Sequence, residues 1–161
     1  YFFVSKSDKL FERYKMKKIL LINGPNLNNL GNRESKFYGN VTLQEIENEV
    51  IKIGKNHSLE IEPFQSNHEG DIVDFIQKNS KKSIGIIINP GALTSSGYSL
   101  VDAIIDSNLT TIEVHLSNIH AREEFRSTSI IAPISKGQIS GLGKDGYIYA
   151  LNYFIHEIIS E

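Results

Sequence analysis

Short apolar runs alternate with amphipathic segments along this chain of 161 residues, and this alternation restricts its fold more than any other feature. Runs such as KILLIN at 18–23 and IGIII at 84–88 have the length of strands, and their continuous apolar character is typical of strands covered on both faces. The segments between them repeat apolar residues every three or four positions, as helices do. The predicted strands span residues 18–23, 59–64, 84–88, 111–114 and 137–140. The predicted helices lie at 42–54, 70–79, 97–106 and 147–158, with a short helical turn at 121–126.

This alternation indicates one doubly wound α/β domain, in which a parallel sheet carries helices on both faces. The length suits a single domain with a hydrophobic core and is short for two. Residues 1–15 precede the only methionine, Met16. We expect these residues to be an N-terminal extension outside the fold, and residues 16–161 to form the domain.

The composition argues against several classes of partner. With 17 basic and 19 acidic residues the formal net charge is −2, and no basic run is interleaved with aromatic residues, so neither nucleic acid nor an anionic membrane is expected to bind. The lack of cysteine excludes disulfides and thiolate chemistry. No apolar run approaches the roughly 20 residues of a membrane span, and the N-terminus lacks the features of a signal peptide. We therefore expect a soluble, cytoplasmic protein.

Polar side chains gather where the predicted strands end, which is where open parallel sheets bind their ligands. Residues of this kind follow four strands: Asn26 after the first, Gln65, Asn67 and His68 after the second, Asn89 and 94–96 after the third, and His115 and Ser117 after the fourth. This convergence favours a small-molecule active site over an interaction surface. No phosphate-binding loop, dinucleotide-binding motif or metal-ligand cluster competes with it.

The fourth strand end carries the strongest chemical signal. Glu113 and His115 lie two residues apart and therefore share one face of a strand, where a carboxylate can orient an imidazole for proton transfer. Backbone N–H groups of Leu116 and Ser117, close to an expected helix N-terminus, could bind a substrate carboxylate. The alternative is a surface ion pair without a catalytic role.

The connection at 24–41 is longer than most strand-to-helix loops and is expected to act as a lid. It carries Arg33 and Tyr38, and a guanidinium near a phenol favours the ionised form, so Tyr38 could serve as a base. Alternatively, Tyr38 packs on the domain and Arg33 is solvated. With Tyr38 as base, His115 as acid and Asn26 for a developing oxyanion, the set suits proton abstraction next to a carbonyl, followed by loss of a β-hydroxyl.

These segments resemble the type II 3-dehydroquinate dehydratases of the shikimate and quinate pathways. The resemblance covers residues 18–159, and the matching motifs are INGPNLNNLGNRESKFYG, FQSNHEGDIVDFI, IIINPGALT, EVHLSNIHAREEFR and GLGKDGY. It implies a flavodoxin-like fold, a homododecamer built from trimers and no cofactor. It also implies anti elimination of water from 3-dehydroquinate through an enolate.

The resemblance also implies a role for each matching residue. Tyr38 resembles the catalytic base, Arg33 the arginine that lowers its pKa, and Asn26 the residue that positions a water and stabilises the enolate. His115 resembles the acid that protonates the leaving hydroxyl, with Glu113 orienting it. The expected substrate contacts are Asn89, Leu116, Ser117, Arg126 and, from a neighbouring subunit, Asp102.

The chain departs from the family pattern at two positions. Ser95 stands where the family usually has a histidine that binds substrate hydroxyls, and Val101 replaces a usual arginine. Helix N-capping is an alternative role for Ser95 and Ser96. The departure motivates a second hypothesis, an inactive or re-specified relative that binds another hydroxylated cyclic carboxylate. A flavin or nucleotide binder is a third, and it rests on fold analogy alone.

Overall fold

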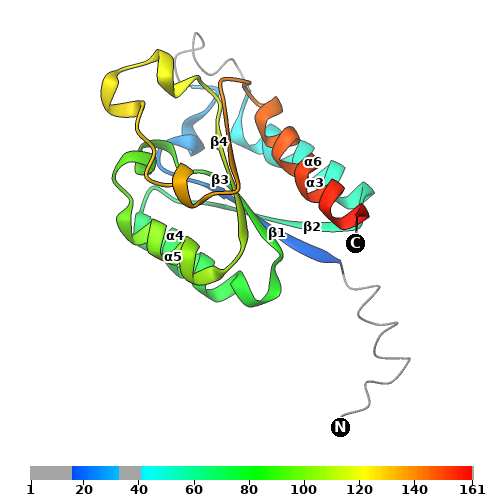
Figure 1. Cartoon of the computed structure of the whole chain (residues 1–161). Helices are drawn as coiled ribbons and strands as arrows, with labels where there is room; N and C mark the ends of the chain where they lie inside the picture. The colour runs from blue at the N-terminus through cyan, green and yellow to red at the C-terminus, as the bar shows by residue number, and fades with distance from the viewer. Residues whose placement is uncertain (1–15, 33–40, 161) are drawn as a thin grey trace, which may run out of the picture.

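A computed structural model describes residues 16–32 and 41–160, and at its centre lies a parallel sheet of five strands (Figure 1). The strands are β1 (Lys17–Asn23), β2 (Leu59–Gln65), β3 (Gly85–Asn89), β4 (Thr110–His115) and β5 (Gly137–Ser140). Their order is β2-β1-β3-β4-β5, and every neighbouring pair is parallel. This order is flavodoxin-like, so the predicted fold class is confirmed.

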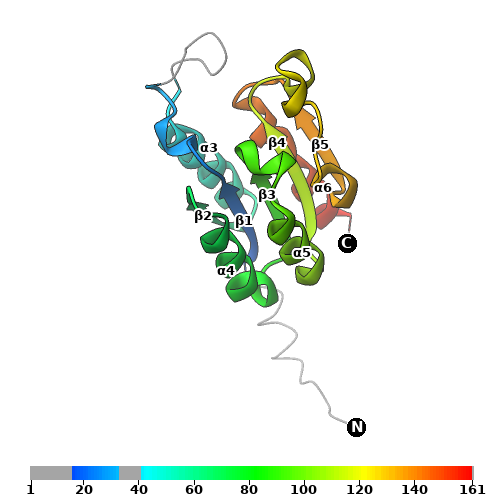
Figure 2. The same cartoon turned by 90° about the vertical axis from the view of Figure 1, so that its left-hand side faces the viewer.

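Helices cover both faces of the sheet, as Figures 1 and 2 show. The four long helices are α3 (Leu43–Asn56), α4 (Glu69–Asn79), α5 (Tyr98–Ser107) and α6 (Asp145–Ile159). Helices α3 and α6 pack on one face, and α4 and α5 pack on the other. The direction of winding reverses between β1 and β3, so the topological switch point lies between these two central strands.

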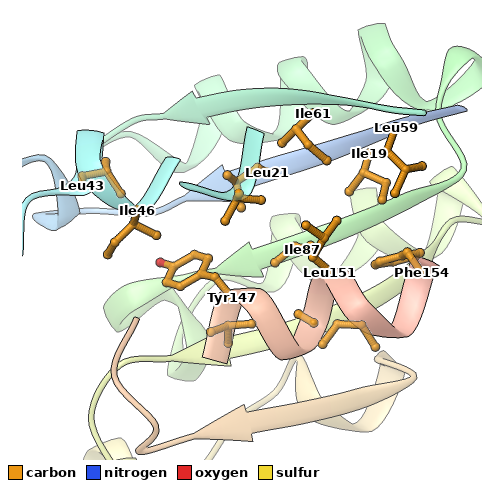
Figure 3. Packing of buried hydrophobic residues seen from close by; sticks show 14 of the residues in the cluster. Ile19, Leu21, Leu43, Ile46, Leu59, Ile61, Ile87, Tyr147, Leu151 and Phe154 are labelled. Carbon is orange, nitrogen blue, oxygen red and sulfur yellow. The ribbon is translucent and has the colours of Figure 1, made fainter. Parts of the chain in front are cut away.

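Alternating side chains of the central strands supply two separate cores. Leu21 and Ile87 point toward α3 and α6, where they meet Tyr147 and Leu151 (Figure 3). Leu20 and Ile22 of β1 belong to the other core and point toward α4 and α5. Each fully buried aliphatic side chain contributes roughly 1.5–3 kcal/mol relative to an exposed one. Burial on both faces is the reason that β1 and β3 read as continuous apolar runs.

The start of α3 is fixed by a capping box. The Glu45 N–H donates to Thr42 Oγ1 at 3.2 Å, and the Thr42 N–H donates to Glu45 Oε2 at 2.8 Å. Two backbone donors that a helix N-terminus leaves unpaired are thereby satisfied. The capping box therefore fixes the start of α3 directly after the connection at 24–41.

Two predictions of local structure are wrong. The expected helical turn at 121–126 is instead two separate 3-10 turns, η4 (Ile119–Ala121) and η5 (Glu124–Arg126), because Arg122 and Glu123 adopt extended backbone between them. Neither Ser95 nor Ser96 caps α5, since both hydroxyls donate to the Ala92 carbonyl. Gly97 occupies the N-cap, and Glu69 Oε1 accepts the Leu100 N–H at 3.0 Å.

The remaining connections contain four more 3-10 turns: η1 (Leu27–Asn29), η2 (Ser80–Lys82), η3 (Gly91–Ser95) and η6 (Ala132–Ile134). Of these, η1 and η3 are the first turns after β1 and β3, the two strands that flank the switch point. Across the described ranges 16–32 and 41–160, no helix is both long and apolar enough to cross a membrane.

Candidate active site

A pocket of about 740 Å³, open to solvent, lies beyond the carboxyl ends of β1, β3 and β4. Seven predicted site residues line it: Asn26, Asn89, Ser95, His115, Leu116, Ser117 and Arg126. The predicted convergence of strand ends is therefore confirmed for three strands. The end of β2 contributes differently, because Gln65 donates to the Gly24 carbonyl and Asn67 accepts the Asn26 N–H at 2.8 Å. These two side chains support the η1 loop and do not line the pocket.

Glu113 and His115 form a buried pair at the end of β4. The Nε2 atom of His115 lies 2.7 Å from Oε1 of Glu113, and the two residues are 5% and 0% exposed. A carboxylate oxygen can only accept, so the hydrogen bond favours the form of the imidazole that carries a proton on Nε2. Nδ1 is then the ring nitrogen left for a ligand. The predicted sharing of one strand face by these residues is confirmed, and the pair is not a surface ion pair.

Four side chains converge on the Glu113 carboxylate. Besides His115, these are Thr94, whose hydroxyl donates to Oε1, Ser129, whose hydroxyl lies 2.9 Å from both oxygens, and Gln138, whose Nε2 donates to Oε2 at 2.9 Å. Burial by itself would raise the pKa of Glu113. The hydrogen bonds from His115 and Thr94, the charge of His115 and the Ser129 bond outweigh that effect and hold the pKa below its usual value. The site thus keeps an ionised carboxylate behind the imidazole.

Sequence reasoning placed Thr94 at a strand end of the site without its contact to Glu113, and it missed Ser129 and Gln138 as members of this site. Gln138 is the register partner of Glu113 across β4 and β5, so strand pairing alone places it beside the carboxylate. Register cannot be read from one strand in isolation. Ser129 lies in an irregular segment and carried no signal in the sequence.

Two arginines give the mouth of the pocket positive charge. Nη1 of Arg122 lies 3.3 Å from Oγ of Ser117, and Nε of Arg126 lies 2.9 Å from Oε2 of Glu123. The Arg126 guanidinium also lies 4.6 Å from the centre of the Phe125 ring. Guanidinium groups next to a serine hydroxyl suit an oxygen-rich anion such as a carboxylate. The expected contribution from a helix N-terminus is wrong, because only the single turn η4 follows Ser117.

The sequence of this chain is similar to those of known proteins. The sequence model of the family described as Dehydroquinase class II matches residues 17–155. A relative from Endomicrobium trichonymphae named 3-dehydroquinate dehydratase is 55% identical over 140 residues, which are 87% of this chain and 98% of the relative. The chain belongs to the class II dehydroquinase family.

Solved structures of this dehydroquinase family have the same fold. The type II dehydroquinase from Butyrivibrio crossotus is 46% identical, with a TM-score of 0.83 over 87% of this chain and 97% of that chain. The enzyme from Propionibacterium acnes is 36% identical, with the same TM-score and coverage. The resemblance inferred from the motifs is thus confirmed.

Two described site predictions of this dehydroquinase family member, Glu113 and Asp102, do not line the pocket, and Glu113 lies directly behind His115. Arg33 and Tyr38 lie outside the described residues. Asp102 is exposed on α5 and is not among the residues that line the pocket of its own chain. Among residues 16–32 and 41–160, no group of three or more His, Asp or Glu side chains is arranged to hold a metal ion.

Proposed function

We propose that this member of the dehydroquinase family is a hydro-lyase that converts 3-dehydroquinate to 3-dehydroshikimate by anti elimination of water through an enolate. The names of its relatives support this substrate. The observation that carries the proposal is the buried Glu113–His115 pair, which lies at the end of β4 where His115 lines the pocket. A buried carboxylate that orients an imidazole beside a ligand pocket is suited to general acid catalysis.

His115 acts as the acid in the proposed mechanism. Glu113 accepts the Nε2–H of the imidazolium, so the Nδ1–H is available to the departing hydroxyl. Transfer of that proton releases the hydroxyl as water and leaves a neutral imidazole. The hydrogen bond to Glu113 keeps the orientation of the imidazole ring constant throughout the step.

Tyr38 acts as the base, and Arg33 favours its ionised form; both lie in the connection outside the described residues. The phenolate removes a proton from the carbon next to the substrate carbonyl, and the carbonyl oxygen carries the resulting enolate charge. Asn26 lines the pocket and offers its side-chain amide, or a water that it positions, to this oxygen. Its backbone is left-handed, with φ 67°, and the bond from its N–H to Asn67 Oδ1 supports that conformation.

The substrate carboxylate binds beside Leu116 and Ser117, and Arg126 contacts the ring hydroxyls. Asn89 donates a further hydrogen bond from the end of β3. In the proposed homododecamer of trimers, Asp102 of a neighbouring subunit completes the pocket, which agrees with its exposed position on α5. The steps use side chains alone and require no cofactor. The expected cytoplasmic location stays a prediction.

Ser95 motivates a second candidate, a re-specified or inactive relative that binds another hydroxylated cyclic carboxylate. Ser95 lines the pocket, but its hydroxyl donates to the Ala92 carbonyl at 3.2 Å. The side chain is short, uncharged and already engaged with the backbone. A subsite formed by Ser95 binds ring hydroxyls less strongly than one formed by an imidazole.

Turnover of 3-dehydroquinate, followed by absorbance of the conjugated enone product, distinguishes the two candidates. The dehydratase predicts turnover by the wild type and losses of about 10²–10⁴-fold in kcat for Tyr38→Phe and for His115→Gln. His156→Gln, on the exposed side of α6, is the matched control and should retain full activity. Calorimetric binding of a hydroxylated cyclic carboxylate without turnover of 3-dehydroquinate would favour the re-specified relative. A protein that neither turns over 3-dehydroquinate nor binds any such carboxylate would overturn both.

A further inference from the structure

A buried phenol connects the two central strand ends beneath the pocket. Tyr147 of α6 is 0% exposed and belongs to the core between the sheet and helices α3 and α6. Figure 3 shows its oxygen turned toward the carboxyl ends of the strands. There it meets Asn23 and Asn89, the last residues of β1 and β3, which are register partners across the switch point.

These side chains form a continuous line of hydrogen bonds, here named the amide–phenol chain, which consists of Asn89, Tyr147, Asn23 and Glu47. Nδ2 of Asn89 donates to the Tyr147 oxygen at 2.9 Å, and the Tyr147 hydroxyl donates to Oδ1 of Asn23 at 2.8 Å. Nδ2 of Asn23 then donates to Oε1 of Glu47, on α3, at 3.2 Å. The first three members each donate in the direction of Glu47, and the Glu47 carboxylate accepts the last of these bonds.

The direction of donation is fixed at both ends. Oδ1 of Asn89 accepts the Gly91 N–H at 3.2 Å, and a backbone N–H can only donate, so the Asn89 amide nitrogen must face Tyr147. At the other end a carboxylate oxygen of Glu47 can only accept. Tyr147 has one proton, and since its oxygen already accepts from Asn89, that proton goes to Asn23.

Asn89 is the member of the amide–phenol chain that reaches the pocket. It lines the pocket, and only one of its two amide N–H donors is used by a hydrogen bond within the described part of the chain. Burial raises the pKa of Tyr147 far above its usual value, so the phenol stays neutral and keeps the proton that the chain requires. A rotated or flipped Asn89 amide would present an acceptor to a substrate oxygen in place of a donor.

We propose that Tyr147 is a positioning residue that, through the amide–phenol chain, holds the Asn89 amide with a donor available to an oxygen of the bound substrate. The inference rests on the proposed function and extends it to a residue that does not touch the substrate. It predicts that removal of one core hydroxyl weakens substrate binding without changing the chemical step. A role limited to stability would affect unfolding and leave KM unchanged.

A double-mutant cycle separates these roles. In the otherwise wild-type protein, Tyr147→Phe should raise KM about tenfold, the equivalent of one lost hydrogen bond, and change kcat by less than about twofold. In the Asn89→Ala background the same substitution should change KM by less than about twofold, because the residue through which it acts is gone. Tyr149→Phe, on the exposed side of the same helix, is the matched control and should leave both constants unchanged.

An equal change in KM in both backgrounds, or no change in either, would overturn the positioning role. A wild-type protein that neither converts nor binds 3-dehydroquinate would refute the proposed function instead. Crystal structures of the wild type and Tyr147→Phe would then decide the inference. An Asn89 side chain rotated away from the Gly91 N–H in the variant supports it, and an unchanged side chain refutes it.

Discussion

Oε1 of Glu113 lies 2.7 Å from Nε2 of His115, with both side chains buried at the end of the same strand. This contact joins the pocket to the interior, because the same carboxylate also accepts hydrogen bonds from Thr94, Ser129 and Gln138. Any change in the carboxylate therefore affects both His115 and the hydrogen bonds around it. The first three predictions below follow from this contact.

Glu113→Gln should lower kcat for 3-dehydroquinate about 10²–10³-fold with little change in KM. The NH₂ group of the amide can only donate, so it would face the groups of Thr94, Ser129 and Gln138 that donate to the carboxylate in the wild type. The contact that orients His115 would be disturbed with it. Steady-state assays of enone formation measure the effect. Asp74→Asn, an exposed carboxylate-to-amide change on α4, is the control and should be silent. Equal activity of both variants would exclude Glu113 from the mechanism.

The contribution of Glu113 to stability should depend on pH. Because its folded pKa lies below the usual value of 4.5, the unfolded chain binds this proton more readily, and the ionised carboxylate stabilises the fold at higher pH. That stabilisation is fully present above the unfolded pKa and is lost as the pH falls through the folded pKa. In urea denaturation from about pH 7 to about pH 3, the advantage of wild type over Glu113→Gln should shrink. A constant difference would contradict the assignment.

Ser129→Ala should reduce the free energy of unfolding by about 1–3 kcal/mol. Its hydroxyl donates to Glu113 and also accepts the N–H groups of Ile131 and Ala132, at 3.1 and 2.8 Å, so three groups lose a partner at once. Urea denaturation checks the value against Ser127→Ala, whose hydroxyl donates only to the nearby Glu124 carbonyl. The control should stay within about 0.5 kcal/mol of wild type.

Gly24→Ala should destabilise the protein by about 3 kcal/mol or more and raise KM. A Cβ atom there would lie 2.3 Å from the Pro90 carbonyl oxygen, and the Gly24 N–H bonds the Asn89 carbonyl, so the loops after β1 and β3 would have to separate. Gly70→Ala is the control, since its Cβ would meet nothing within 4 Å. In α4 that change should be neutral or stabilise by up to about 1 kcal/mol. Thermal unfolding compares the two variants.

Ser95→His should lower KM for 3-dehydroquinate about five- to tenfold and leave kcat within about twofold, because an imidazole reaches further into the pocket and adds one hydrogen bond. Ser96→His, at the neighbouring exposed position that does not line the pocket, is the matched control. An unchanged KM in Ser95→His would show that this subsite does not contact the ring hydroxyls.

The sequence alone determined the sheet, four of its helices and the family. Burial on both faces leaves continuous apolar runs in β1 and β3, and the capping box at Thr42 is a contact within one turn, so both can be read locally. The pairing of Glu113 with His115 was also local, because a strand places alternate side chains on one face. The structure of residues 121–126 could not be read locally, since helical spacing does not reveal that Arg122 and Glu123 have extended backbone.

Only the tertiary structure decided which distant groups surround these residues. Gln138 reaches Glu113 through strand register, Ser129 through an irregular segment, and Tyr147 reaches Asn23 and Asn89 across 124 and 58 positions of sequence. Alone, the sequence shows Tyr147 as one more apolar residue on α6, because its hydroxyl acquires a role only when two strand ends converge on it. A hydrogen bond depends on positions in space to within a fraction of an ångström, and hydrophobic pattern fixes only the face on which a side chain lies.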